Sequence, residues 1–401
     1  MLRPIAEPGG RSPVLLPGQS HWLDTYGLDS DQADSMPVRF LMAILRKVAG
    51  AGAAGWLPIA IALIGAGVGA AALVGGSGWR RRAAGIAFVV NPFVFERLRA
   101  GHVYVLLGMA VLPWLVASAL AAKRSGALFR VRTAAVFALA IACAPHMFWI
   151  GLVALAAITF TNGVRRADVI RLGLTLVAAA ATMAYALALQ AVGVHTVSIT
   201  DADLAAYGTR GGGGLGTLAD VVTLHGFWRG GSTPASWWGP LWPVLVAFAV
   251  MVAVRGLRVS RATAADDRSL ILPVRTMAAA GVLLACGVAG PTGWLFRLAF
   301  HHLPLFQVMR EPQKFVMLVA LAWAVAFGVA ADSLAPRVLL PSMRTARLVA
   351  WCVLPLATAP TLLWGLAGEV QHRGGGIRAA QRGRDERVIL RRRPGGHRGV
   401  R

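Results

Sequence analysis

The sequence predicts an all-α membrane protein: a polytopic transmembrane bundle with about nine or ten crossings, some made by broken helices. Apolar residues make up 57% of the 401 positions and charged residues 14%, with a mean hydropathy of +0.62. Soluble domains carry about a quarter charged residues. The apolar residues also cluster in blocks of about 20, the helical length that crosses a bilayer core. Composition therefore excludes a disordered chain, a collagen-like fibre and a small disulfide scaffold.

Nine apolar blocks define the expected helices. Most fit one crossing, but the block at 83–95 is interrupted by Asn91-Pro92, and the block at 133–161 is too long for one helix. The long block contains Ala144-Pro145-His146, and proline ends or kinks a helix, so we expect it to cross twice. The blocks run over residues 56–75, 83–95, 102–122, 133–161, 168–190, 239–254, 270–290, 314–332 and 346–366.

Basic residues alternate between connections, as they do in multi-pass membrane proteins. One set of five connections holds 17 Lys and Arg, and it comprises residues 76–82, 121–132, 162–171, 255–268 and 333–347. The intervening connections 91–101, 191–238 and 291–311 hold six. The basic set is expected in the cytoplasm. The same distribution accounts for the net charge of +23, so we expect membrane lipid and no nucleic acid as a partner.

The predicted domain organisation has three parts. Residues 1–55 form an external N-terminal segment, residues 56–366 form the transmembrane domain with an external loop at 191–238, and residues 367–401 form an Arg/Gly-rich tail without apolar periodicity. The tail is expected to be disordered at a membrane surface. Two alternatives stay open: a re-entrant last block that leaves the tail inside, or a displaced reading frame. An external N-terminal segment without a preceding span also suggests a truncated chain.

The first candidate site lies at residues 91–102. Pro92 stops a helix within the bilayer, and Glu96, Arg97, Arg99 and His102 follow it. Charges beside a broken membrane helix are costly unless they line a wet cavity. Arg97 and His102 are therefore candidate anion ligands. The alternative is an ordinary connector with a Glu96–Arg99 pair.

The second candidate site lies at residues 303–315. Pro312 suits the first position of a helix, whose N-terminal N–H groups favour anions. Arg310 and Lys314 flank that turn and could clamp a phosphate or carboxylate. The alternative is a capped helix with basic residues at the membrane interface.

Acidic and aromatic candidates lie in the predicted external segments. One of Asp24, Asp29, Asp31 and Asp34 could act as a general base, or the acids could bind a divalent cation; a solvated acidic loop is the alternative. No cofactor is required by the pattern, and metal use is left open. Trp228 and Trp237, in the 191–238 loop with Trp238, could stack on sugar rings or anchor the loop at the interface.

At these motifs the chain resembles the bacterial GT-C-type integral membrane glycosyltransferases, in particular the arabinofuranosyltransferase-like proteins of actinobacteria. The likeness covers roughly residues 56–366 and is specific at three short stretches. These are Asn91-Pro92-Phe93 with Arg97-Leu98 and Gly101-His102, then Leu224-His225-Gly226-Phe227-Trp228, and finally Leu303-Pro304-Leu305-Phe306 with Arg310-Glu311-Pro312-Gln313-Lys314-Phe315. The chain departs from the family in lacking a first membrane helix before the acids and a large external C-terminal domain.

The resemblance implies an enzyme of the cell membrane that works on its outer face. It implies a sugar donor on a polyprenyl phosphate, an acceptor glycan of the cell envelope, an inverting transfer and an acidic base in the first external loop. Arg97, His102, Arg310 and Lys314 would then bind the donor phosphate. A transporter or flippase for lipid-linked sugars, or a non-catalytic membrane fragment, are the rival functions.

Overall fold

The computed structural model describes residues 36–125, 131–161, 163–184, 200–211, 216–228, 242–258, 265–303 and 305–333, with residues 345 and 349. Every regular element within these ranges is a helix, which confirms the all-α prediction. By length and composition, four of the described helices could cross a membrane: Pro37–Val74, Val103–Arg124, Ala265–Ala285 and Pro312–Ala331. Two shorter apolar helices, Val131–Cys143 and Met147–Phe160, accompany them.

The last long helix forms the centre of the bundle. It starts as a 3₁₀ turn, η4 (Pro312–Phe315), and continues as α16 (Val316–Ser333). In its most apolar stretch 89% of the residues are buried, compared with 39% for the first long helix. A helix that is apolar all round must be covered by other helices. α16 is accordingly packed against α3 (Gly78–Val89), α13 (Trp242–Gly256) and α14 (Ala265–Ala285).

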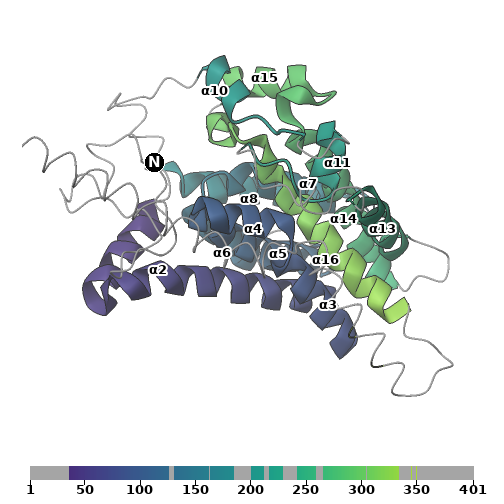
Figure 1. Ribbon diagram of the computed structural model, residues 1–401. Helices are drawn as coiled ribbons and strands as arrows, with labels where there is room; N and C mark the ends of the chain where they lie inside the picture. The colour runs from purple at the N-terminus through teal and green to yellow at the C-terminus, as the bar shows by residue number, and fades with distance from the viewer. Residues whose placement is uncertain are drawn as a thin grey trace, which may run out of the picture.

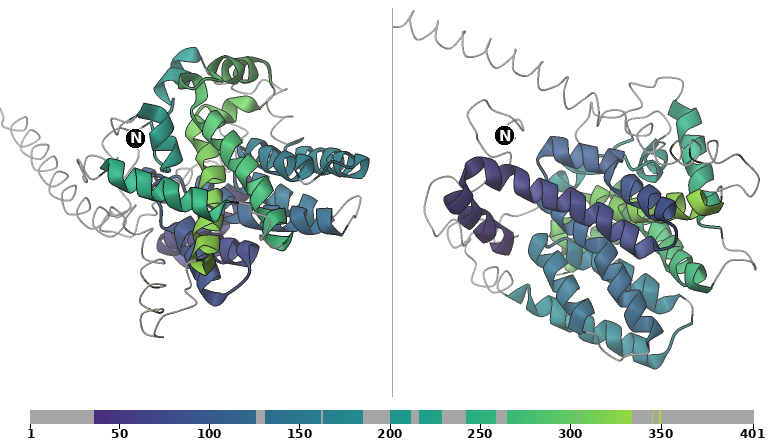
Figure 2. Two further views of the ribbon diagram at one scale, coloured as in Figure 1. Left: turned by 90° about the vertical axis from the view of Figure 1, so that its right-hand side faces the viewer. Right: turned by 90° about the horizontal axis from the view of Figure 1, so that it is seen from below.

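The first long helix, α2 (Met36–Val74), covers one side of the bundle, as the view from below in Figure 2 shows. It packs on α5 (Val103–Arg124) and α3. Its backbone is non-helical at Gly50, where φ is 85°. Large apolar side chains remain exposed along its outer side, which suits contact with acyl chains; they are Phe40, Leu41, Ile44, Trp56, Leu57, Ile61, Ile64 and Val68.

This helix begins earlier than the sequence suggested. The apolar block was expected to start at residue 56, whereas the helix runs from Met36 with a break at Gly50. Val38 and Met42 are buried one turn apart, whereas Phe40, Leu41 and Ile44 are exposed, so residues 36–49 form a largely apolar helix. Basic residues on its other positions, such as Arg39 and Lys47, lowered the average hydropathy and concealed it.

The long block at 133–161 is interrupted at the predicted break and folds back on itself. α6 (Val131–Cys143) ends at the predicted break, and three residues separate it from α7 (Met147–Phe160). The two helices pack together, with α6 also against α8 (Arg166–Ala181). Gly151 of α7 leaves room for the ring of the fully buried Phe137.

The basic connections meet at one end of the bundle, which we call the basic end. Arg80 pairs with Asp267 at 2.5 Å, and Arg124 lies 3.8 Å from Asp266. Lys123 Nζ donates to carbonyl oxygens at the end of α7, among them Ile158 at 2.8 Å. Four of the five connections predicted to share a side are therefore adjacent.

The other connections meet at the opposite end, which we call the network end. It contains α4 (Pro92–Ala100), α10 (Asp201–Ala206), α11 (Gly216–Val222), η2 (Gly287–Ala289), α15 (Gly293–His302) and η3 (Phe306–Met309). α10 and α15 lie side by side at the top of Figure 1, far from α3, and His301 contacts Asp201 at 3.1 Å. The His301 and His302 side chains are exposed at this end.

Candidate functional site

The first candidate segment is shaped by Asn91, which caps two helices at once. Its side-chain amide donates to the carbonyls of Ala87 at 3.2 Å and Phe88 at 2.7 Å, at the end of α3. Its Oδ1 accepts from the Val94 N–H at 3.1 Å, at the start of α4. Asparagine is a preferred N-cap, and Pro92 at the next position cannot donate a bond anyway. The Asn91-Pro92 pair therefore ends one helix and starts the next.

α4 ends in a left-handed turn that places Arg97 at its C-terminal end. Gly101 has φ 73°, and its N–H bonds back to Arg97 and Leu98, while the His102 N–H reaches the Arg97 carbonyl at 2.9 Å. Glycine adopts this conformation without strain. The C-terminal end of a helix is favourable for a cation, and Arg97 and Arg99 occupy the last turn.

Arg97 is the centre of the site. Its side chain is 0% exposed. Its main partner, Glu311, lies 214 residues away in the sequence. Nη1 donates to Glu311 Oε2 at 2.5 Å and to His102 Nδ1 at 2.7 Å. Nη2 donates to Gln313 Oε1. Arginine only donates hydrogen bonds, so His102 Nδ1 is the acceptor in this contact.

Two helix ends support the Arg97–Glu311 pair. Glu311 precedes η4 and the long helix that continues from it, and Pro312 occupies the first position of that turn, as predicted. An anion is stabilised at a helix N-terminus and a cation at a helix C-terminus. The dipoles of α4 and of η4–α16 therefore favour the same ion pair, which partly offsets the cost of burying both charges.

Gln313 links this pair to a second acid. Its Nε2 donates to Glu96 Oε2 at 3.0 Å, while its Oε1 accepts from Arg97. Gln313 is 0% exposed and Glu96 is 2% exposed. Glu96 Oε1 is buried and makes no hydrogen bond among the described residues. A buried carboxyl of this kind favours its protonated form.

The two acids are expected to differ in ionisation. Burial raises the pKa of Glu96 well above its usual value, with Asp220 adding to the shift and Arg97 opposing it. Burial also acts to raise the pKa of Glu311, but Lys314, Arg97 and His102 outweigh it and hold that pKa well below its usual value. The pKa values of the two carboxyls are thus shifted in opposite directions. Carboxyls driven apart in this way are typical of functional sites.

Aromatic rings enclose the guanidinium groups. The Arg97 guanidinium lies 4.6 Å from the Phe227 ring centroid and 5.2 Å from that of Phe93. Arg310 lies 4.7 Å over Tyr207. Trp228 packs edge-on against Tyr207, with centroids 4.8 Å apart. These cation–π contacts connect both candidate segments to the long loop.

The loop between 220 and 228 reaches the site through a tight turn. Leu224 has φ 67°, an unusual value for leucine, and Gly226 has φ 98°. The His225 N–H bonds to the Asp220 carbonyl at 2.6 Å, and both side chains are buried. Burial lowers the pKa of His225 to about 3, so this histidine is neutral. Backbone strain of this kind is often retained at functional sites.

The second candidate segment packs beside the first. Lys314 Nζ donates to the Val308 carbonyl at 2.9 Å. Trp149 of α7 donates to the Leu305 carbonyl at 3.3 Å, and Leu305 has φ 61°. His146, at the turn between α6 and α7, is buried close enough that Lys314 and Arg97 add to the lowering of its pKa by burial. The helix break at 144–146 therefore borders the same cluster.

The structure brings together the five predicted site residues that it describes. Arg97, His102, Arg310, Lys314 and Trp228 all lie at the network end. Arg97 is fully buried, whereas Arg310 and Lys314 are half-buried. Asp24, Asp29, Asp31, Asp34 and Trp237 lie outside the described residues.

Other residues at the site were not singled out as ligands. Glu311, Gln313 and Phe227 occur in the motif stretches, but their partners are more than 100 residues away, which no local pattern reveals. Nothing in the sequence around Tyr207 indicated a place at the site, apart from its being one of only four tyrosines. Among the residues that the structure describes, no group of three or more His, Cys, Asp or Glu side chains is placed to hold a metal ion.

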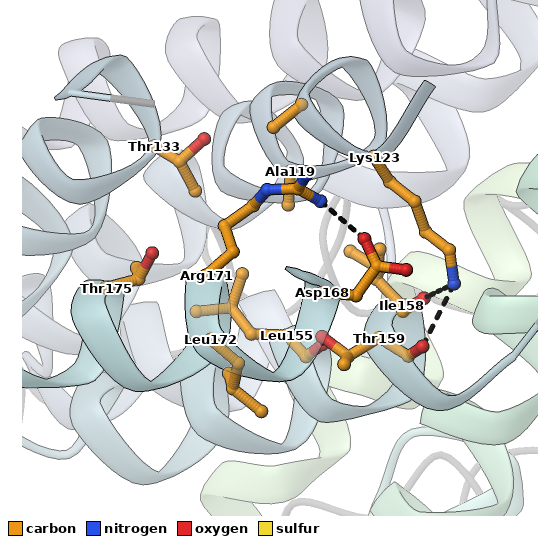
Figure 3. A pocket seen from close by; sticks show the side chains of 11 residues that line it. Ala119, Lys123, Thr133, Leu155, Ile158, Thr159, Asp168, Arg171, Leu172 and Thr175 are labelled. Atoms are coloured by element: carbon orange, nitrogen blue, oxygen red, sulfur yellow. Dashed lines mark hydrogen bonds and ion pairs between the residues drawn. The ribbon is translucent and has the colours of Figure 1, made fainter. Parts of the chain in front are cut away.

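A small cavity lies at the basic end (Figure 3). It has a volume of about 30 Å³, and its lining combines Lys123, Asp168, Arg171 and three threonines with five apolar residues. Arg171 pairs with Asp168 at 2.7 Å, and Lys123 caps the carbonyls that end α7. Its volume suits one or two waters, and its charged groups stabilise helix ends.

Comparison of the chain with protein-family models, with curated proteins and with solved structures finds no match.

Proposed function

We propose that the chain is a membrane glycosyltransferase that transfers a sugar from a polyprenyl-phosphate donor to a cell-envelope glycan, at the outer face of a multi-pass membrane domain. One observation carries the proposal: two broken-helix segments distant in sequence meet around a buried arginine, next to further cations and aromatic rings. Buried ionisable residues in an apolar bundle are costly and are usually retained for function.

The proposed reaction needs electrostatic stabilisation more than covalent chemistry. The acceptor hydroxyl oxygen attacks the anomeric carbon, the bond from that carbon to the phosphate oxygen breaks, and the polyprenyl phosphate leaves with the electron pair. A carboxylate, one of Asp24, Asp29, Asp31 and Asp34, takes the hydroxyl proton. Arg310 and Lys314, with His102, are proposed to stabilise the charge that develops on the phosphate.

Arg97 has a different proposed part, because it is enclosed by protein. Its guanidinium fixes Glu311, Gln313 and His102 relative to one another. It is therefore a positioning residue that also contributes positive potential. The half-buried rings of Tyr207 and Trp228 are suited to packing against a sugar face.

The test is sugar transfer in membranes from a polyprenyl-linked pentose or hexose. Arg310→Ala should lower the transfer rate by about 10²-fold, the effect of removing one donor to a developing anion. Arg297→Ala, an exposed arginine of α15, is the matched control and should retain activity. Equal rates for Arg310→Ala and the wild type would remove Arg310 from the mechanism. Sugar-lipid translocation without transfer would favour the flippase alternative.

A further inference from the structure

One short helix at the network end, α15, has an apolar side that is left exposed. Its inner side is buried in the bundle and is formed by Gly293, Phe296 and Phe300. Its outer side exposes Trp294, Leu295 and Leu298, which have the spacing of one helix face. Trp294 is 70% exposed and Leu298 is 49% exposed. Large apolar side chains that gather on one face mark a contact with a partner or a membrane.

The outer side of α15 continues from the surface of a helix that could span the membrane. The hydroxyl of Thr292, the N-cap residue of α15, donates to the Leu283 carbonyl at 3.4 Å. Leu283 is exposed in the last turn of α14, and α14 is long and apolar enough to cross a bilayer. The sequence carries no charged residue from 276 to 296. The uncharged stretch that begins in α14 therefore runs on into the first turn of α15.

The size and the composition of this face favour lipid over a protein partner. α15 has ten residues and is about 15 Å long, so its outer side offers only a small part of the about 800 Å² that each partner buries in a stable protein interface. Tryptophan is enriched where a membrane meets water. The exposed Arg297, His301 and His302 follow along the same helix, and such side chains suit the headgroup region.

α15 is also joined to the segment that carries Arg310. Phe296 packs edge-on against Phe306 of η3, with ring centroids 5.2 Å apart, and Arg310 directly follows η3. At the other end of α15, His301 contacts Asp201 of α10 at 3.1 Å. α10 in turn leads to the aromatic ring over which the Arg310 guanidinium lies. Whatever holds α15 in place therefore also helps to place Arg310.

We propose that the outer side of α15, formed by Trp294, Leu295 and Leu298, docks on the membrane leaflet at the network end, just below the lipid headgroups, and anchors residues 305–310 at that depth. The occupant of this face is thus the bilayer itself. The docking does not depend on sugar transfer and is measured without a substrate. If the proposed function holds, the same anchor sets the depth at which Arg310 meets the phosphate of a lipid-linked sugar.

An environment-sensitive fluorophore on single cysteines tests the docking in the full-length protein, reconstituted into phosphatidylcholine vesicles. Leu298→Cys is the test position. Val68→Cys, on the outer side of α2, is the lipid-facing reference, and Ala205→Cys, exposed on α10, is the water-facing reference. Lipids with a nitroxide on the acyl chain near the headgroup should quench the label at 298 and leave the label at 205 bright. The emission at 298 should be shifted to the blue, as at 68.

The parent chain, treated in the same way, reports the labelling of its native cysteines. Emission at 298 that matches the water-facing reference, without quenching, would overturn the docking. Blue-shifted emission without quenching by the nitroxide lipids would show that protein covers the face, and it would overturn the docking as well. Cross-linking of two chains through Leu298→Cys would have the same consequence, because a second copy would then be the occupant.

A spin label at Gln307→Cys, an exposed position of η3, tests the anchoring. Trp294→Gln combined with Leu298→Gln removes apolar contacts from the outer side of α15 and leaves the buried side intact. The label should therefore become more mobile in vesicles. Arg297→Gln, at a neighbouring exposed position, is the matched control and should leave the mobility unchanged. Equal mobility in the double variant and the parent, or an equal rise in Arg297→Gln, would overturn the anchoring.

Discussion

Arg97 shows what a buried charge needs in order to persist in an apolar bundle. It is the largest side chain that the described residues bury below 2% exposure. Its two terminal nitrogens donate to the Glu311 carboxylate, the His102 imidazole and the Gln313 side-chain amide oxygen. Two aromatic rings flank its guanidinium group. Such a network is stable only when nearly all members are satisfied, so single substitutions should cost more than the loss of one bond.

A double-mutant cycle tests this coupling. Arg97→Met leaves the Glu311 carboxylate buried without a counter-charge, and it should destabilise the protein by about 3–5 kcal/mol. Adding Glu311→Met removes that uncompensated charge, so the double variant should be more stable than the sum of the single changes predicts. Thermal unfolding in detergent measures both. Additive effects would show that the pair is not energetically coupled.

Histidine burial gives a pH dependence of definite sign. The pKa of His225 is lowered by burial from 6.5 to about 3, so the stability it contributes is full above the unfolded value and is lost as pH falls from 6.5 toward 3. Burial of His146 acts in the same direction. Glu311 adds a loss below about pH 4, where its unfolded form binds a proton, whereas Glu96, with its raised pKa, favours the folded state in acid.

His225→Gln should therefore flatten the acid limb of the stability profile, by up to about 1.4 kcal/mol per pH unit between pH 6 and 4. Thermal unfolding between pH 7.5 and 4 checks this, with the wild type run in the same buffers. A variant as acid-sensitive as the wild type would mean that His225 is not held neutral in the folded state.

Helix pairs in this protein are fixed by small residues at close contacts. At Gly151 an added Cβ would collide with the ring of Phe137, which is fully buried and cannot move aside. Gly173 is also inside a helix, α8, but it is exposed and an added Cβ would meet nothing within 4 Å. Substituting alanine at each of the two glycines therefore distinguishes the effect of tight packing on stability from the effect of helix propensity.

Gly151→Ala should destabilise the α6–α7 hairpin by about 1–3 kcal/mol through overpacking. Gly173→Ala should stabilise α8 by about 0.5–1 kcal/mol, because alanine is the better helix former. Unfolding temperatures of both variants in detergent measure the difference. If Gly151→Ala were as well tolerated as Gly173→Ala, the close α6–α7 contact would be wrong.

The elements were largely predictable because their signals are local. Asn91-Pro92, Ala144–His146 and Pro312 interrupt or start helices where the sequence placed the breaks. The start of α2 was not predictable in the same way, because Arg39, Arg46 and Lys47 hide its apolar stripe from an averaged hydropathy. The pairing of Arg97 with Glu311 could not be predicted from the sequence, because Glu311 could equally have paired with Lys314 or Arg310 on its own turn.

At the scale of the whole molecule, the two ends of the bundle differ in chemistry. The basic end gathers Arg80, Lys123, Arg124 and Arg171 with acids that neutralise only part of their charge. The network end gathers the buried Glu96 and Glu311, the buried His146 and His225, and aromatic rings around Arg97 and Arg310. The positive-inside rule assigns the basic end to the cytoplasm, which would place the residues proposed to bind the donor phosphate at the outer face, where lipid-linked sugars and envelope glycans meet.

Single-cysteine labelling in intact cells tests this most directly. His302→Cys at the network end and Arg258→Cys at the basic end are both exposed positions, and the parent chain reports the background from its native cysteines. A membrane-impermeant maleimide should label His302→Cys in intact cells and label Arg258→Cys only after the membrane is opened. Labelling of Arg258→Cys in intact cells, with His302→Cys protected, would put the Arg97–Glu311 cluster in the cytoplasm and contradict the account.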